Sequence, residues 1–160
     1  MNGKTLTIII IIVVTVIVGG YLFSGNSASD NLEISKELQG KQFTLYKDPN
    51  CGCCGLYAAH LRRAGFEVLV HEEENMTSIK EEFGVPRDLQ SCHTSVIGDR
   101  IIEGHMPIEG IQALFSQDEI MAVSLPGMPS GSPGMSGAKK GPFMTYSFGP
   151  DREPETFIEL

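Results

Sequence analysis

The feature that most constrains this chain is a cluster of three cysteines within four residues, Cys51-Gly52-Cys53-Cys54, with a fourth cysteine at Cys92. The cluster follows a strand-like segment and precedes a helical pattern, so we expect it at a strand-to-helix turn, where three sulfurs can converge on one point. Thiolates are soft ligands that suit Cu(I), zinc and iron–sulfur centres. They are also the reactive species in thiol–disulfide exchange. The fold is therefore expected to present this turn to a metal or to a reaction partner.

Strand and helix patterns alternate along the chain after residue 40. Alternating apolar positions predict strands, and apolar positions at helical spacing predict helices. The predicted strands cover residues 42–48, 66–70 and a hairpin at 96–102, and the predicted helices cover residues 53–64, 75–84 and 107–115. The order β-α-β-α-β-β-α is that of an α/β thioredoxin-like fold. A right-handed β-α-β unit makes its two strands parallel, which places the cysteine turn at the carboxyl end of the sheet, where α/β folds bind ligands.

Cys92 stands just before the predicted hairpin, in the phrase QSCHT. In a thioredoxin-like layout this loop faces the first turn of the helix that begins at the cysteine cluster. A fourth sulfur there would complete a site of four cysteines. His93, if it lies on a strand, is expected to point away from Cys92 and to serve as a hydrogen-bonding residue. His60 and His71 are expected to be surface or satisfied polar residues.

The first 23 residues have the character of a transmembrane helix. The run from Leu6 to Phe23 contains no charged residue, and as a helix it would be about 27 Å long, close to the hydrocarbon core of a bilayer. Lys4 precedes the run and the first charges after it are acidic, which by the positive-inside rule predicts export of the rest. We expect a single-pass anchor on the periplasmic side of the inner membrane, or a free periplasmic protein if the segment is cleaved.

Composition bounds the remainder of the chain. A net charge of −8 argues against nucleic acid and against an anionic membrane surface as partners. A stretch rich in glycine, proline, serine and methionine follows the last predicted helix, and two short strand-like segments end the chain, which predicts a loop and a β-hairpin. The predicted division is an anchor or signal segment at residues 1–23, a linker at 24–39, a thioredoxin-like metal-binding domain at 40–125, and the loop with C-terminal strands packed on that domain at 126–160.

Three phrases resemble the DUF411 family, which includes the CopG-type periplasmic copper-resistance proteins: YKDPNCGCCGLYAAHLRRAGFEV, GVPRDLQSCHTSVIGDRIIEGHMP and LPGMPSGSPGM. The resemblance implies an exported protein that binds Cu(I), as one ion or as a multinuclear cluster with redox activity. The implied partners are copper ions and periplasmic copper-handling proteins. The implied ligands are Cys51, Cys53, Cys54 and Cys92. The candidate auxiliary ligands, which lie in the matching phrases, are His105, Met106, Met128 and Met135.

Other interpretations of the cysteines stay open, and the sequence leaves open whether the protein is an enzyme. The CxxC formed by Cys51 and Cys54 could act in a thiol–disulfide oxidoreductase, with metal binding incidental. The four cysteines could instead be structural disulfides of an interaction module, for example Cys51–Cys54 and Cys53–Cys92. A staple that closes a loop of a few residues removes little unfolded-state entropy, which argues against that role. Zinc and iron–sulfur centres are the remaining metal alternatives.

Overall fold

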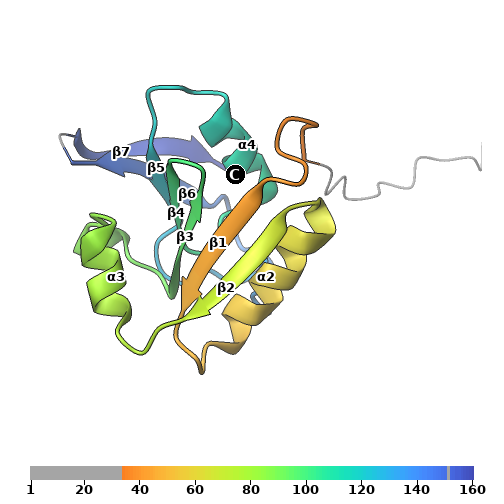
Figure 1. The fold of residues 1–160 in the computed structure, drawn as a ribbon. Helices are drawn as coiled ribbons and strands as arrows, with labels where there is room; N and C mark the ends of the chain where they lie inside the picture. Colours follow the sequence, from red (N-terminus) through yellow and green to blue (C-terminus); the bar gives the residue numbers. More distant parts are fainter. Residues whose placement is uncertain (1–33, 151) are drawn as a thin grey trace, which may run out of the picture. The chain divides into compact units, whose positions relative to one another are not determined.

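One mixed sheet of seven strands organises residues 34–150 and 152–160, the part of the chain that the computed structural model describes (Figure 1). The order of the strands in the sheet is β2-β1-β3-β4-β5-β6-β7. The strands are β1 (Gln42–Lys47), β2 (Glu67–Glu72), β3 (His93–Ile97), β4 (Arg100–Glu103), β5 (Ala122–Ser124), β6 (Met144–Gly149) and β7 (Arg152–Glu159). The helices are α2 (Gly52–Ala64), α3 (Met76–Glu82) and α4 (Ile108–Phe115), with a 3₁₀ turn, η1 (Arg87–Leu89), before β3.

A parallel β-α-β unit, made of β1, α2 and β2, forms one edge of this sheet. The helix ends at Gly65, whose left-handed backbone (φ 109°) lets its amide group bond to carbonyl groups of the last helical turn. On its other side β1 pairs in antiparallel with β3, and the last residue of β1, Lys47, lies opposite the first residue of β3, His93. The turn from β1 into α2 and the start of β3 therefore lie at the same end of the sheet.

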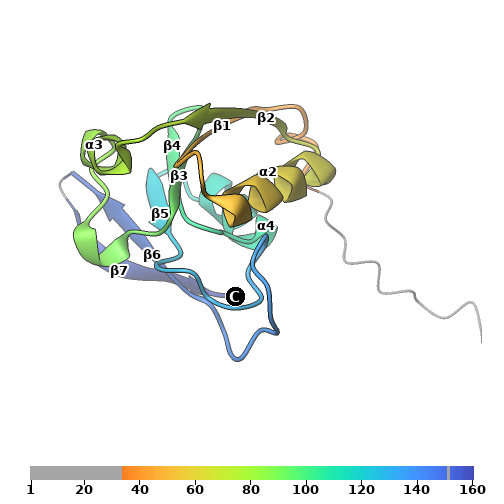
Figure 2. The same cartoon turned by 90° about the horizontal axis from the view of Figure 1, so that it is seen from below.

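The two faces of the sheet pack against different helices. Alternate residues of a strand point to opposite faces, and in β1 the side chains of Phe43 and Leu45 are buried in the larger core, with residues of α2 and α4. On the other face Tyr46 contacts Phe83, at the end of α3, with 5.5 Å between ring centroids. Figure 2 shows α2 and α4 on one side of the strands and α3 on the other. Both faces of the central strands are thus covered.

The predicted fold class was wrong about the C-terminal part of the chain. Instead of a separate hairpin packed on the domain, the last strands continue the main sheet, because β5 pairs in parallel with β4 and in antiparallel with β6. The connecting strand β5 was not predicted, since three buried residues are too few to show an alternating pattern. Backbone hydrogen bonds in both directions join Phe143 to Leu160, and both side chains pack into the larger core.

The same prediction included a transmembrane helix, which the structure does not support. The segment in question, residues 1–23, lies outside the described residues. Within residues 34–150 and 152–160, no helix combines the length and the apolar character needed to cross a membrane. The prediction rested on hydropathy, which reports how apolar a run is and not what structure it adopts. The predicted division into domains stays a prediction, although Ile34 and Leu38, from the expected linker, are buried in the larger core.

Candidate metal centre

The turn from β1 into α2 carries three of the four cysteines. Its backbone is held by Asp48, whose carbonyl oxygen accepts from the amide of Cys51 (3.0 Å) and whose carboxylate accepts from the amide of Asn50 (2.7 Å). Cys51 is the residue that precedes the first turn of α2, and Cys53 and Cys54 lie within that turn. Local sequence is therefore sufficient to bring these three side chains to the end of the sheet where β3 begins.

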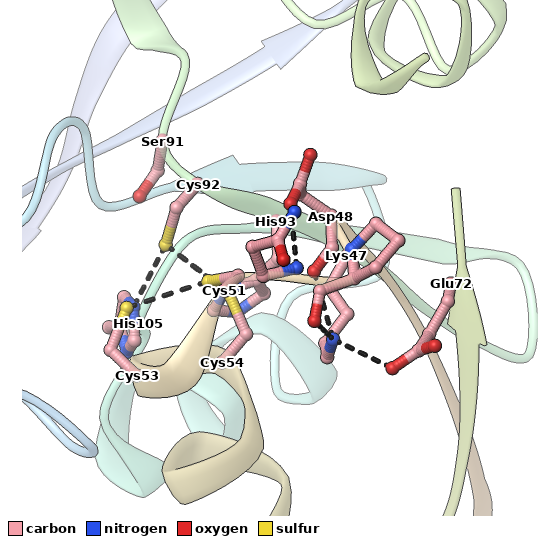
Figure 3. The surroundings of a disulfide bond; sticks show 12 residues. Lys47, Asp48, Cys51, Cys53, Cys54, Glu72, Ser91, Cys92, His93 and His105 are labelled. Atoms are coloured by element: carbon pink, nitrogen blue, oxygen red, sulfur yellow. Dashed lines mark hydrogen bonds and ion pairs between the residues drawn. A yellow bond between two sulfur atoms is a disulfide. The ribbon is translucent and has the colours of Figure 1, made fainter. Parts of the chain in front are cut away.

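The four sulfur atoms form one cluster (Figure 3). Cys51 and Cys54 are joined by a disulfide, and Cys53 and Cys92 are free thiols. The Sγ atom of Cys53 lies 3.5 Å from that of Cys51, and the Sγ atom of Cys92 lies 3.6 Å from that of Cys54. All four sulfur atoms lie within 4.8 Å of one another. The fold thus brings Cys92 from a different part of the chain to the sulfurs of the β1–α2 turn.

Two histidines lie against Cys92. Its Sγ atom is 3.0 Å from Nε2 of His105 and 3.5 Å from Nδ1 of His93. The other ring nitrogen of His105, Nδ1, lies 2.7 Å from the carbonyl oxygen of Pro133. A carbonyl oxygen only accepts, so Nδ1 carries the hydrogen and Nε2 of the neutral ring accepts from the Cys92 thiol. Together with Cys54, these residues form a second group of four donor atoms within 4.8 Å of one another.

The position of His93 differs from the one expected. It was predicted to point away from Cys92, but the alternation of side chains holds within a strand, and Cys92 lies before the first residue of β3. The His93 ring is fully buried between Tyr57 and His105, with 4.7 Å to each ring centroid. Its Nε2 atom has no hydrogen-bond partner among the described residues. Adjacency to Cys92 was the one signal in the sequence for this candidate ligand.

The candidate methionine ligands lie in three different environments. Met106 is fully buried, its sulfur lies against Gly110 of α4, and its carbonyl oxygen accepts from the hydroxyl group of Tyr57 (2.8 Å). Met135 is half-buried, and Met128 is 57% exposed. The auxiliary role of these methionines stays a prediction.

The loop rich in glycine and proline packs against both parts of the site. Pro133 supplies the carbonyl oxygen that orients the His105 ring. At the next residue, Gly134, a Cβ atom would come within 2.9 Å of the carbonyl oxygen of Cys53. The backbone of Gly134 also has a positive φ of 82°, which favours glycine. At the start of the loop Gly127 forms a bridge to Ser91. The loop therefore connects the β1–α2 turn to the segment before β3.

A buried ion pair supports the start of β3 and the end of β4. The carboxylate of Glu103 accepts from the ammonium group of Lys80 (2.5 Å), the hydroxyl group of Thr94 (2.6 Å) and the amide of Ser91 (2.7 Å). Glu103 is fully buried and Lys80 nearly so. Ser91 comes directly before Cys92, and Glu103 is the last residue of β4, two residues before His105. The network therefore holds the backbone next to Cys92 against the end of β4.

Burial sets the protonation of the donors near β3. Burial, followed by the neighbouring Cys53, raises the pKa of Cys92 to about 12. Burial also lowers the pKa of His105, and it lowers the pKa of His93 well below the usual value. At neutral pH the metal-free site therefore holds a protonated thiol between two neutral imidazoles. A metal ion that binds Cys92 would displace this proton, because the thiolate is the ligand.

Comparison with known proteins identifies the family. A family model described as a protein of unknown function, DUF411, matches residues 89–135. Two solved structures, of copper resistance protein CopG in Form 2 and Form 1, are each 33% identical to the chain, with TM-scores of 0.71 and 0.70. Each covers 76% of this chain, and the matches span 99% and 98% of the CopG chains. A comparison with curated proteins finds no match. The chain belongs to the DUF411 family and is similar to CopG copper-resistance proteins over most of its length.

Proposed function

We propose that the protein holds Cu(I) on Cys51, Cys53, Cys54 and Cys92 and acts in copper resistance in the periplasm. The observation that carries the proposal is the convergence of all four sulfur atoms within 4.8 Å from two separate parts of the chain. Sulfur ligands favour Cu(I) over harder cations. The similarity to CopG supports copper as the metal.

The chemistry of the donor atoms fits more than one copper ion. Two groups of four donors share Cys54 and Cys92, one completed by sulfurs of the β1–α2 turn and the other by His93 and His105. Imidazole is a good ligand for copper, and shared thiolates can connect adjacent ions. The Nδ1 atom of His93 lies 3.5 Å from Sγ of Cys92, which supports a ligand role for this ring. A multinuclear copper centre is therefore part of the proposal.

Copper binding at all four cysteines requires the reduced protein. The Cys51–Cys54 disulfide must gain two electrons and two protons to become two thiols. These thiols then lose their protons to a bound metal, because thiolate is the ligand. Loading of the site is thus coupled to the redox state of the β1–α2 turn, because two of the proposed copper ligands, Cys51 and Cys54, also form a disulfide with each other.

The proposal is tested by anaerobic titration of the fully reduced, full-length protein with Cu(I). Thiolate-to-copper charge-transfer absorption should grow with each addition. Cys92→Ser should weaken the band strongly and lower the copper stoichiometry. His71→Gln, an exposed residue on β2, is the control and should match the unaltered protein. A sample with four thiols counted and no charge-transfer band would contradict the proposal.

A second candidate function, thiol–disulfide oxidoreductase, is favoured by the Cys51–Cys54 disulfide at the start of α2. A helix start favours a cysteine thiolate and so increases its reactivity. Metal-free protein should then reduce a disulfide substrate, and Cys54→Ser should abolish the activity. Failure of metal-free protein to reduce any disulfide substrate would leave copper binding as the function. The fully disulfide-bonded module has less support, since Cys53 and Cys92 are free thiols.

A further inference from the structure

A free thiol lies in contact with the disulfide of the β1–α2 turn. The Sγ atom of Cys92 is 3.6 Å from Sγ of Cys54, which is bonded to Cys51. In thiol–disulfide exchange a thiolate attacks one sulfur of a disulfide and expels the other. Attack by Cys92 on Cys54 would make Cys51 the leaving sulfur.

The same thiol has a base in hydrogen-bond contact. Nε2 of His105 lies 3.0 Å from Sγ of Cys92, and the opposite nitrogen of the ring donates to the carbonyl oxygen of Pro133 (2.7 Å). A nucleophile, a base and a group that orients the base occur in this order in enzymes that activate cysteine or serine. Figure 3 shows the Cys92 sulfur between the imidazole of His105 and the disulfide.

We propose that Cys92 exchanges the Cys51–Cys54 disulfide for a Cys54–Cys92 disulfide, with His105 as the general base. The S–H bond of Cys92 breaks, and its proton passes to Nε2 of His105. The sulfur of Cys92 forms a bond to Sγ of Cys54 as the Cys51–Cys54 bond breaks, and the electron pair of that bond leaves on Cys51. The thiolate of Cys51 then takes up the proton. One disulfide and two thiols are present before and after, so the step needs no oxidant or reductant.

The exchange changes which cysteines are available to other molecules. Before it, the free thiols are Cys53 and Cys92, one on each part of the site. After it, the free thiols are Cys51 and Cys53, both on the β1–α2 turn, where their sulfurs lie 3.5 Å apart in the starting form. A pair of adjacent thiols suits capture of one soft metal ion or attack on a disulfide of a partner protein. The step itself takes place without metal and does not rest on copper binding.

Peptide mapping distinguishes the two disulfides. Tryptic cleavage places Cys51 and Cys54 on one peptide, residues 48–62, and Cys92 on another, residues 88–100. The original disulfide is therefore internal to one peptide, whereas the exchanged disulfide joins two. A full-length Cys53→Ser variant removes the remaining thiol that could also bond to Cys92.

The experiment incubates copper-free Cys53→Ser protein, which carries one disulfide, with N-ethylmaleimide under anaerobic conditions. Alkylation of Cys51 traps the exchanged form, so the joined peptides should accumulate with the label on Cys51. Adding His105→Asn should slow this trapping about a hundredfold, a common contribution of a general base. Adding His71→Asn, on β2 outside the site, should leave the rate unchanged. Equal rates in these two variants would overturn the role of His105.

A second variant tests whether the Cys54–Cys92 disulfide can form. This test depends neither on the rate of trapping by N-ethylmaleimide nor on His105. In the double variant Cys51→Ser with Cys53→Ser, the remaining cysteines are Cys54 and Cys92. These two should form a disulfide in a glutathione buffer that oxidises Cys51 and Cys54 in the unaltered protein. Failure to form it, or labelling confined to Cys92 with no joined peptides in the first experiment, would overturn the proposal.

Discussion

The two parts of the chain that meet at the site are built differently. The β1–α2 turn carries three cysteines in four residues, and a Cβ atom added at Gly52 or Gly55 would meet nothing within 4 Å. The segments next to β3 and β4 bring Cys92 and His105 together across a hairpin, and Gly104 beside them has no free space. The first part has open space at its two glycines, although Cys54 is buried, and the second is closely packed at its glycine. Substitutions at the exposed positions of the first part should therefore cost little stability, whereas substitutions at the buried positions of the second should cost much.

The largest expected effect comes from the buried ion pair behind Cys92. Glu103→Gln removes the charge that pairs with Lys80, so that an ammonium group is left buried without its counter-charge. Loss of one partner of a buried pair costs about 3–5 kcal/mol of unfolding free energy. Urea unfolding of the copper-free protein measures this loss.

The control for Glu103→Gln is the ion pair beside the β1–α2 turn. Glu72 pairs with Lys47 at 3.0 Å, and the Glu72 side chain is 59% exposed. Glu72→Gln should cost less than about 1 kcal/mol, because solvent screens the exposed Glu72 carboxylate and the ammonium group of buried Lys47 keeps the carbonyl oxygens of Asp48 and Pro49 as acceptors. Equal losses in the two variants would contradict the distinction between exposed positions of the first part and buried positions of the second.

The glycines of the two parts provide the next comparison. Gly104 has a φ of 81°, and a Cβ atom there would lie 2.5 Å from the carbonyl oxygen of Leu125 and 2.7 Å from Cβ of Ser91. Backbone strain and overpacking together should make Gly104→Ala cost about 2–4 kcal/mol. Gly55→Ala, within α2 and in open space, should instead stabilise the protein by about 0.5–1 kcal/mol. Thermal unfolding of both variants shows whether each substitution stabilises or destabilises the protein. A stabilising Gly104→Ala would contradict close packing around Gly104.

Lower pH should destabilise the copper-free protein through its buried histidines. In the unfolded chain a histidine has a pKa near 6.5, whereas burial lowers the pKa of His93 in the fold. Below about pH 6.5 the unfolded state therefore binds more protons, and stability falls as pH falls, by up to about 1.4 kcal/mol per pH unit for each such group. His93→Gln should flatten the dependence measured by urea unfolding between pH 7 and 5. His71→Gln should preserve it, and an unchanged slope in His93→Gln would contradict the prediction.

The smallest effect is expected at the exposed methionine of the glycine- and proline-rich loop. Met128→Ala should change the free energy of unfolding by less than about 0.5 kcal/mol, as exposed substitutions usually do. If Met128 is an auxiliary ligand, competition with a Cu(I) chelator should show weaker copper binding than in Met121→Ala, a second exposed methionine. Identical affinities in the two variants would remove Met128 from the candidate ligands.

Elements with strong local patterns could be predicted from the sequence, and those without could not. The helix predicted at residues 53–64 is found at Gly52–Ala64, because its apolar spacing and its terminal glycine are both local signals. Strand β5 was missed, since its three residues are buried on both faces and show no alternation. The merging of the last strands into the main sheet depends on β5 and was therefore missed as well.

The sequence by itself determined that three sulfurs would lie together, because three cysteines at the start of one helix have few other arrangements. It also indicated Cys92 as the fourth member, through the order of strands and helices and the resemblance to DUF411 proteins. Only the tertiary structure decided that His93 faces the sulfurs, that His105 is oriented by Pro133, and that Lys80 and Glu103 form a buried pair behind them. These contacts depend on strand register and on side-chain packing between residues far apart in the chain, and neither leaves a local pattern.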